Sequence, residues 1–375
     1  MGNSVLGGRT SVESKRCTTT KFYTSAAWIE GRAEEQLEHI AGWSGVRKIA
    51  AFPDLHPGKY GPVGCAVLAD RIFPQLIGND IGCGMSLFQM DLPLRKFKME
   101  KALRRIRVLD APQDKDFSPR LAGISEMAKP FLNALGTIGG GNHFCEVQTL
   151  VEGETDLDKS LLYLLIHSGS RGIGNAVLNA VPEGSFAGLD PESTAAQTYV
   201  QNHNAAVQWA KLNRQIIAER AAEALRADVR LIVDAPHNLL SFESGGWLHR
   251  KGAASAASDL IPLAGSRASP SYLLRPTGAP DALASTAHGA GRRYDRSSMH
   301  GRVRAKRSDL EAMTRTTFGG RIICEDRDLL VEEAPHAYKS SQNVVRDLEA
   351  TNAARSVAKF HPLLTYKKIR KGDRS

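Results

Sequence analysis

Apolar positions recur at helical spacing in several parts of the chain, and these segments predict helices. Residues 27–45 carry apolar side chains at this spacing and end in a glycine, which is a common stop signal. Residues 97–108 and 117–135 are amphipathic in the same way, and residues 193–226 form the longest stretch of this kind. The pattern therefore predicts helices in these four segments.

Short apolar runs bounded by glycine, proline or polar residues predict strands between them. Residues 46–70 predict a strand, a Pro/Gly loop and a second strand, and residues 161–174 predict a buried strand that enters a glycine turn. Residues 229–240 predict a strand that ends at a polar turn. The Gly/Ser/Pro-rich tract over 252–280 predicts loops around one short strand, SYLL.

Because helices and strands follow one another in mixed order, we predict a single α+β domain over residues 1–375. The chain has 375 residues, of which 42% are hydrophobic and 24% charged, enough for a substantial core. We find no internal repeat, coiled coil or interdomain linker in the sequence. Residues 1–25 are expected to be flexible.

The sequence carries no membrane or export signal that we recognise. No apolar run approaches the roughly 18 residues that a bilayer span needs. The first residues, MGNSVLGGRTSVESKR, lack the apolar region of a signal peptide, and Leu6 stands where a myristoylation signal has serine or threonine. We therefore expect a cytoplasmic protein without a membrane partner.

The cysteines argue against a disulfide framework or a zinc ribbon. They are odd in number, widely scattered and never paired as CxxC: Cys17, Cys65, Cys83, Cys145 and Cys324. In a reducing compartment, four of the five are expected to be ordinary small buried side chains.

The positive charge of the chain favours polyanionic partners, nucleic acid first. The net charge is +9, and the basic residues gather in Arg95–Arg107, Gly291–Arg307 and Lys367–Arg374. A basic run is more often a solvated face than a binding site, and that alternative applies to each segment. Gly291–Arg307 directly follows a candidate site described next, which favours a functional interpretation.

Polar residues capable of chemistry stand at five predicted strand ends, each next to glycine or a sharp turn. They are Asp80 and Cys83 in GNDIGCGM, Asn142 and His143 in GTIGGGNHFCEV, His167 in LLIHSGSRGIG, His237 and Asn238 in VDAPHNLL, and His288 in STAHGAGRR. Imidazole and carboxylate donors suit Mn²⁺ or Zn²⁺, and one thiolate can bridge two ions. A single histidine before glycine is usually structural, but four of them with an Asp/Cys pair predict a metal site.

The motifs GNDIGCGM, GGGNHFCEV, IHSGSRGIG, HRKGA, SYLL and HGAGR resemble the RtcB family of GTP- and Mn²⁺-dependent RNA ligases. The likeness runs from about Trp28 to Lys371. The chain is shorter than ordinary members and is most similar to the compact subgroup coupled to release factor H. The resemblance implies a single domain with mixed β-sheets around a two-metal cleft.

The resemblance also implies a reaction. Family members join an RNA end bearing a 3′-phosphate or 2′,3′-cyclic phosphate to a 5′-hydroxyl, through a covalent histidine–GMP formed from GTP. By motif, His288 is the guanylylated histidine. The implied ligands of two Mn²⁺ ions are Asp80, Cys83, His143, His167 and His237, with Cys83 touching both ions.

Further site residues follow from the same motifs. Arg171 and Arg292, each four residues after a motif histidine, are candidates for clamping phosphate, with ordinary salt bridging as the alternative. Guanine recognition maps to Asn142, Phe144, Glu146, Ser271, Tyr338 and Lys367, with Lys368 as a rival to Lys367. Asp54 and His56 in FPDLHPGK match a motif near the active centre, where they would contact RNA ends or metal-bound water.

One turn departs from the family pattern. Ordinary members have PGS-Met-Gly where this chain has AGSRASPSY, and the stretch between Ser271 and His288 is two residues short. From these changes we expect a reshaped base pocket and a less strict preference for GTP.

The chain lacks the motifs of three rival enzyme classes. It contains no GxSxG of serine esterases, no KxDG of lysine-dependent ligases or capping enzymes, and no GxxxxGK[ST] of P-loop NTPases. The remaining alternative is a catalytically weakened relative that binds RNA or ribosomes. For an active ligase, the compact-subgroup resemblance implies cleaved small-subunit ribosomal RNA as substrate and a release factor H-like partner, with tRNA repair as the alternative.

Overall fold

The computed structural model describes residues 17–110, 117, 120, 126–154, 156–303 and 306–368. Most of the segment expected to be flexible, residues 1–16, lies outside these described residues. Within its remainder, β1 (Thr18–Lys21) pairs in parallel with Lys48–Ala51, so this part is an ordered edge strand. No helix of the described residues is long and apolar enough to cross a membrane.

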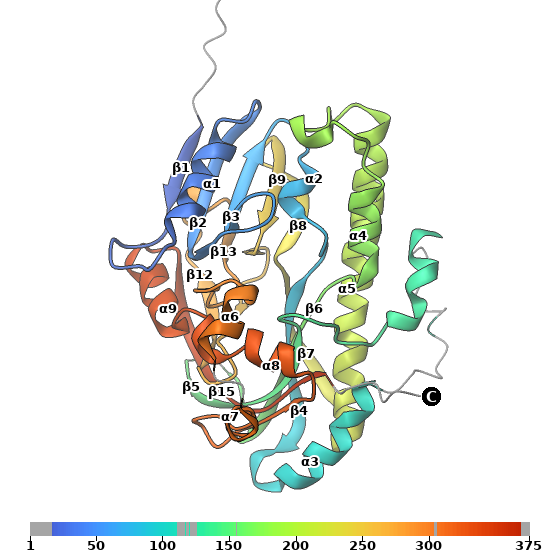
Figure 1. The fold of residues 1–375 in the computed structure, drawn as a ribbon, viewed down its shortest axis with the longest axis vertical. Helices are drawn as coiled ribbons and strands as arrows, with labels where there is room; N and C mark the ends of the chain where they lie inside the picture. The colour runs from blue at the N-terminus through green and yellow to red at the C-terminus, as the bar shows by residue number, and fades with distance from the viewer. Residues whose placement is uncertain are drawn as a thin grey trace, which may run out of the picture.

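An eight-stranded sheet forms the lower half of the molecule (Figure 1). Its order is β11-β12-β15-β5-β6-β4-β7, and β14 pairs with β15 off this path. Neighbouring strands are antiparallel except β14 and β15. The strands are β4 (Gly84–Pro93), β5 (Phe144–Gly153), β6 (Leu161–Ser168), β7 (Val229–Pro236), β11 (Ile261–Leu263), β12 (Ser271–Pro276), β14 (Arg321–Cys324) and β15 (Ala354–Lys368).

A second sheet of five strands lies above the first, in the order β1-β2-β3-β9-β8. A two-stranded ribbon of β10 and β13 accompanies it. The remaining strands are β2 (Val46–His56), β3 (Val63–Ala69), β8 (Asn238–Glu243), β9 (Gly246–Lys251), β10 (Ala253–Ser255) and β13 (Ser285–Ala287). The predicted strand–loop–strand over residues 46–70 is thus confirmed as β2 and β3.

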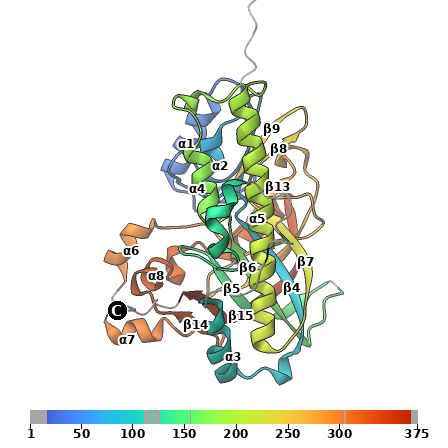
Figure 2. The ribbon, with the colours of Figure 1, turned by 90° about the vertical axis from the view of Figure 1, so that its right-hand side faces the viewer.

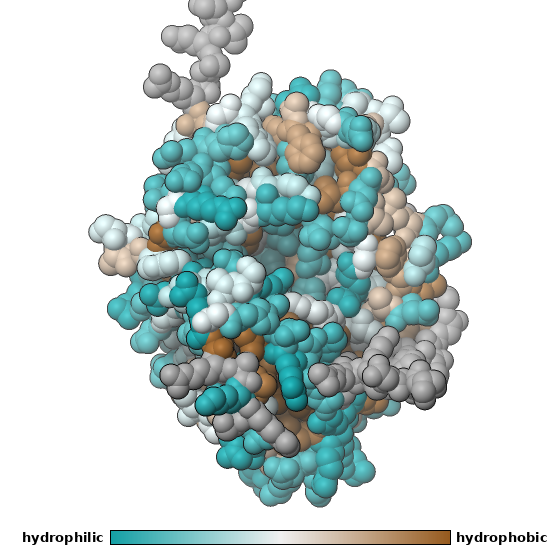
Figure 3. Space-filling view, in the orientation of Figure 1, coloured by the Kyte–Doolittle hydropathy of each residue, from teal (hydrophilic) through white to brown (hydrophobic). Residues whose placement is uncertain are grey.

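Helix α5 (Thr194–Leu225) runs along one side of the molecule, beside strands of the large sheet (Figure 2). The Ser193 hydroxyl caps it by accepting from the Ala196 N–H, and its inward face buries Trp209 completely. The other α-helices are α1 (Gly31–Ala41), α2 (Pro74–Ile77), α3 (Met99–Arg105), α4 (Gly172–Asn179), α6 (Arg296–Arg302), α7 (Arg307–Ala312), α8 (Arg327–Glu332) and α9 (Ser341–Ala350). Hydrophilic residues cover most of the face shown in Figure 3.

The α+β prediction is confirmed, and the differences concern local elements. The tract over 252–280 holds β10 and β11 besides the predicted SYLL strand. The three-residue β11 pairs with β12, the SYLL strand itself, and β10 pairs with β13 beyond the tract. The glycine turn after β6 continues into α4. Of the helix predicted over 117–135, the described part from Glu126 to Ala134 is a 3₁₀ helix that contains Pro130.

Strand register explains how the candidate residues meet. Gly84, at the start of β4, lies opposite both Ser168 at the end of β6 and Pro236 at the end of β7. Phe144, at the start of β5, lies opposite His167. Because neighbouring strands are antiparallel, starts of β4 and β5 share an edge with the ends of β6 and β7. The polar residues next to these positions therefore converge on one edge of the sheet.

Candidate active site

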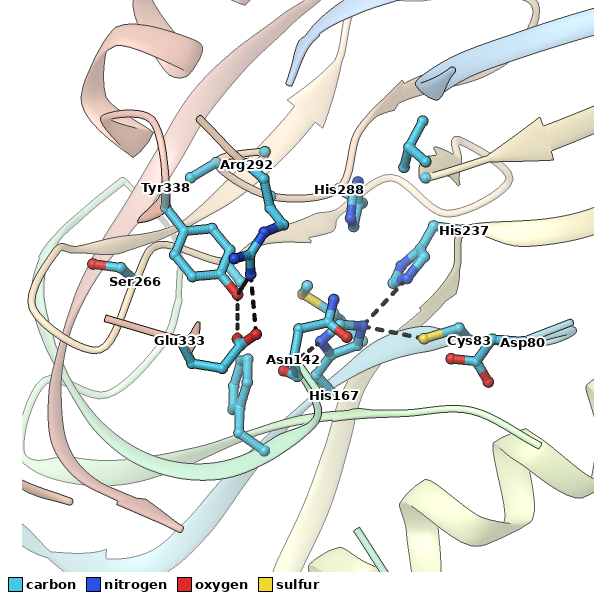
Figure 4. Close-up of a pocket in the computed structure, with 18 of the residues that line it drawn as sticks. Asp80, Cys83, Asn142, His167, His237, Ser266, His288, Arg292, Glu333 and Tyr338 are labelled. Carbon is cyan, nitrogen blue, oxygen red and sulfur yellow. Dashed lines mark hydrogen bonds and ion pairs between the residues drawn. The ribbon is translucent and has the colours of Figure 1, made fainter. Parts of the chain in front are cut away.

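Side chains from both sheets line a cavity of about 420 Å³. Residues from every predicted strand-end site face it, including Asp80, Cys83, Asn142, His237 and His288 (Figure 4). The volume falls within the range of small-molecule sites in proteins.

Donor atoms of the five predicted metal ligands form a continuous cluster, in which Asp80 is partly exposed and the other four residues are buried. Asp80 Oδ2 lies 2.9 Å from His143 Nε2, and Cys83 Sγ lies 3.4 Å from the same nitrogen. On its other side, Cys83 Sγ is 3.2 Å from His167 Nε2, which is 3.3 Å from His237 Nε2. The cluster comprises two metal-capable groups, and Cys83 belongs to both.

The protonation states of the side chains in the cluster are suited to binding metal cations. Burial holds the pKa values of His167 and His237 well below the ordinary histidine range, so both rings are neutral and offer lone pairs. Burial, with Asp80 adding to it, raises the pKa of the Cys83 thiol. A bound divalent ion reverses that preference, because it binds the thiolate. Two neutral imidazole Nε2 atoms 3.3 Å apart, beside a thiol and a carboxylate, fit a metal better than a hydrogen-bonded network.

Backbone contacts orient the ligands. The Asn142 carbonyl accepts from His167 Nδ1 at 3.2 Å, which leaves Nε2 of that ring as the ligand atom. Gly82, two residues after Asp80, has φ +73°, and an added Cβ would lie 2.9 Å from the Val207 Cα of α5. A larger residue at this position would therefore displace the loop that carries Asp80 and Cys83.

Arg214 of α5, which sequence reasoning missed, supports this edge of the sheet from behind. Its side chain is fully buried and pairs with Asp234 of β7 through contacts of 2.8 and 3.1 Å. It also donates to the carbonyls of Gly82 at 2.8 Å and Ser168 at 2.9 Å. One guanidinium thus fixes the ends of three strands. The available signal was an arginine on the apolar side of the longest predicted helix.

His288 follows β13 and is held by a buried carboxylate. Asp54 Oδ2 accepts from His288 Nδ1 at 2.7 Å and from the His288 backbone N–H at 3.2 Å, and Asp54 is fully buried. The Nδ1 contact leaves Nε2 as the other ring nitrogen. The His288 ring centroid lies 4.3 Å from that of His237, so this ring adjoins the metal-capable cluster.

His56, predicted near the active centre with Asp54, also lines the cavity. Its Nδ1 donates to the Asp54 carbonyl at 2.8 Å, and burial lowers its pKa to about 4, so the ring is neutral near pH 7. Lys339, which sequence reasoning missed, donates to the carbonyls of Pro53 and Leu55 at 2.9 and 2.6 Å. It fixes the backbone on both sides of Asp54.

The end of the cavity away from the cluster contains a carboxyl and an ammonium group. Glu146 accepts from Thr365 Oγ1 and from Gln148 Nε2, and burial raises its pKa to about 7. Lys367 is 5% exposed and lines the cavity. Lys368 instead pairs with Asp326 at 2.9 Å on the exposed side of the strand. The structure therefore places Lys367, and not its rival, at the candidate base pocket.

Glu333 is the main residue that sequence reasoning missed here. It lies 3.0 Å from Arg292 NH1 and 3.4 Å from Lys367 Nζ, and it accepts from the Tyr338 hydroxyl. Burial alone would raise its pKa, but Lys367 and Arg292 lower it to about 2, so it is ionised. The available signal was the sequence EEAPHAYK, where this glutamate stands five residues before Tyr338.

Three other predicted site residues lie in different places: one lines the cavity, one lines another cleft and one lies behind the cavity wall. Arg292 lines the cavity and is paired with Glu333 at 3.0 Å. Arg171 lies outside this cavity and lines a neighbouring cleft of about 980 Å³, where its Nε is 3.3 Å from Thr137 Oγ1. Ser271 lies behind the wall, accepting from Gln148 Nε2 and the Gly265 N–H, both at 3.1 Å.

Comparison with known protein families shows to which family the chain belongs. The family model described as tRNA-splicing ligase RtcB matches residues 36–115 and 117–368. The chain belongs to the RtcB family. All the predicted site residues fall within the matched segments.

Relatives of this RtcB family member match it nearly from end to end. It is 38% identical to "RNA-splicing ligase RtcB2" of Escherichia coli over 91% of its own length and 93% of the relative. It is 28% identical to "RNA-splicing ligase RtcB" of Escherichia coli strain K12, covering 90% and 93%. It is 27% identical to "tRNA-splicing ligase RtcB" of Archaeoglobus fulgidus, covering 89% and 91%.

Proposed function

We propose that this RtcB family member is an RNA ligase that uses GTP and Mn²⁺. It joins an RNA 3′-phosphate or 2′,3′-cyclic phosphate to a 5′-hydroxyl through a covalent histidine–GMP. The observation that carries the proposal is the position of His288, held by buried Asp54 and adjoining a cluster able to bind two metal ions. The relatives named RNA-splicing ligases support the same reaction class.

The donor set fits two divalent ions. Asp80, Cys83 and His143 would hold one, and Cys83 with His167 and His237 would hold the other. Imidazole and carboxylate donors suit Mn²⁺, and the thiolate can bridge. When bound, the ions neutralise charge on the phosphates, which is the main demand of phosphoryl transfer.

The contact with Asp54 prepares His288 for attack. With Nδ1–H donated to the carboxylate, Nε2 of the neutral ring carries the free lone pair. Nε2 attacks the α-phosphorus of GTP, so that a P–N bond forms as the P–O bond to pyrophosphate breaks. The carboxylate stabilises the positive charge that develops on the ring. GMP then passes to the RNA 3′-phosphate, and the 5′-hydroxyl displaces it as the new phosphodiester forms.

The far end of the cavity is complementary to guanine. Guanine presents N–H donors on one side of its ring edge and a carbonyl acceptor beside them. Glu146 supplies the acceptor and Lys367 the donor, while Asn142, Phe144 and Tyr338 line the space around them. Ser271 supports this wall through its bonds to Gln148 and Gly265 rather than by lining the cavity.

The RNA proposed as substrate is cleaved small-subunit ribosomal RNA, with a release factor H-like partner; tRNA repair is the alternative. The net charge of +9 supports a polyanionic substrate of either kind. Within the basic segment Gly291–Arg307, Arg302 stacks on the Tyr294 ring at 4.0 Å, whereas Arg304 lies outside the described residues. Neutralising Arg302, Arg304 and Lys306 should weaken RNA binding at all sequences and flatten its salt dependence.

Sealing of defined RNA ends tests the ligase proposal. Purified protein with GTP and Mn²⁺ should join a 3′-phosphate end to a 5′-hydroxyl end, and should leave 3′-hydroxyl and 5′-phosphate ends unjoined. Cleaved small subunits and nicked tRNA anticodon loops, at equal concentration and with the release-factor partner added, then separate the two substrates. Binding of RNA without joining would instead support the catalytically weakened relative.

A further inference from the structure

The turn between β11 and β12 fixes the direction of one arginine, Arg267. Ser266 and Ser269 close the turn, because the Ser269 hydroxyl accepts from the Ser266 N–H at 2.6 Å and the Ser266 carbonyl accepts from the Ser269 N–H at 2.9 Å. Gly265 makes this turn possible, since an added Cβ would lie 2.1 Å from the Pro270 carbonyl oxygen. Between these anchors, the side chain of Arg267 is turned inward, lines the cavity and is 6% exposed.

Arg267 has two donors without a partner. Its NH2 donates to the Leu330 carbonyl at 2.9 Å, but Nε and NH1 are buried and have no hydrogen-bond partner among the described residues. The neighbouring cations Arg292 and Lys367 both pair with Glu333. A buried guanidinium with unsatisfied donors is costly, so its retention on a cavity wall points to a ligand that accepts hydrogen bonds.

The surroundings of Arg267 show which part of a ligand it would meet. Burial lowers its pKa, while Cys324, Glu333 and Tyr338 act in the opposite direction. Glu333 and Tyr338 line the cavity, and Glu333 lies 3.4 Å from Lys367. Figure 4 shows Glu333 and Tyr338 on the opposite side of the cavity from Asp80 and Cys83. Arg267 therefore lies with the base-recognition groups and away from the phosphate chemistry.

Guanine offers acceptors that suit an arginine there. Its O6 and N7 atoms are adjacent acceptors that arginine commonly contacts in protein–DNA complexes, whereas adenine has an amino group in place of O6. We propose that Arg267 donates hydrogen bonds to N7 and to the second lone pair of O6, beside the donor Lys367, and sets the preference for GTP over ATP. This inference rests on the proposed function, because it assigns one residue of the same nucleotide site.

Equilibrium binding tests the assignment without relying on turnover. The α,β-methylene analogues of GTP, ITP and ATP, which cannot transfer the nucleotide, are titrated in Mn²⁺ against wild type, Arg267→Met and Arg275→Met. Methionine keeps the length of the side chain but has no donors, and exposed Arg275 on β12 is the matched control. Arg267→Met should weaken GTP- and ITP-analogue binding by about tenfold or more and leave ATP-analogue binding unchanged. Arg275→Met should change none of the three.

Thermal unfolding separates recognition from a structural role. The midpoint of Arg267→Met should equal or exceed that of wild type, because the substitution removes an incompletely paired buried charge. A lowered midpoint with an unchanged preference between GTP and ATP analogues would overturn the assignment, as would equal weakening of all three. If wild type forms the histidine adduct with GTP, these results overturn only the role of Arg267. If wild type neither binds the analogues nor forms the adduct, the proposed function fails with it.

Discussion

Substituting Asp54 by asparagine tests the contact that prepares His288. The carboxylate is fully buried and one of its oxygens accepts two hydrogen bonds from His288, at 2.7 Å from Nδ1 and 3.2 Å from the backbone N–H. Asparagine keeps the size of the side chain and one acceptor, but it removes the negative charge that faces the ring as it becomes an imidazolium.

The magnitude follows from the type of bond that is lost. A hydrogen bond to a charged group contributes about 1.5–3 kcal/mol, compared with about 1 kcal/mol for a neutral one. The charge matters chiefly in the transition state, where the ring gains its positive charge. Because asparagine keeps a neutral acceptor, the loss is the difference of about 0.5–2 kcal/mol. The rate of histidine–GMP formation should therefore fall by roughly 2- to 30-fold, since about 1.4 kcal/mol corresponds to a factor of ten.

The assay is the single-turnover rate of adduct formation with saturating GTP and Mn²⁺. Asp281→Asn provides the matched control, because that aspartate is exposed and pairs only with Lys48 at the surface. The thermal midpoint of each variant checks that the fold is intact. An Asp54→Asn protein that folds, binds metal and forms the adduct at the wild-type rate would refute the role assigned to this carboxylate.

Three other predictions follow from the site. Cys83→Ala should lower the metal content, measured by elemental analysis, more than alanine at any of the other four cysteines. The reason is that Cys83, alone among the cysteines, belongs to both metal-capable groups. Equal loss of metal in all five variants would contradict the cluster. Arg214→Met should lower the free energy of unfolding by about 3–5 kcal/mol in denaturant titrations, because it leaves Asp234 buried without its partner. The control Arg230→Met, at an exposed arginine, should lower it by under about 1 kcal/mol. Burial raises the pKa of Glu146 to about 7, so the carboxylate proposed to accept from guanine forms only as pH rises through that value. GTP-analogue affinity should therefore increase between about pH 6 and 8 in wild type, and a Glu146→Gln protein with the same pH profile would contradict this role.

The residues of the metal-capable cluster could be predicted because their signals are local. Asp80, Cys83 and the motif histidines each stand beside glycines at a strand end, and antiparallel pairing then brings these ends to one edge. The alternation of side chains along a strand also distinguishes Lys367 from Lys368, since neighbouring residues on a strand face opposite sides. Recognising β15 as a continuous strand would have decided between them.

The residues that sequence reasoning missed depend on contacts between distant segments. Arg214 lies on a helix yet holds the ends of three strands, and the partners of Glu333 come from Arg292, Tyr338 and Lys367 on separate elements. Local spacing carries no signal for such contacts. The inward direction of Arg267 likewise depends on the serine pair that closes its turn and on the carbonyl of Leu330 in α8.

The most direct test of the central claim is to locate the covalent nucleotide. After incubation with GTP labelled at the α-phosphate and Mn²⁺, the protein should carry an acid-labile, base-stable label, as a phosphoramidate does, and peptide mass spectrometry should place it on His288. His288→Ala should abolish the label while metal content stays near that of wild type, and exposed His300→Ala should label normally. A label that survives His288→Ala, or that maps to another residue, would contradict the account.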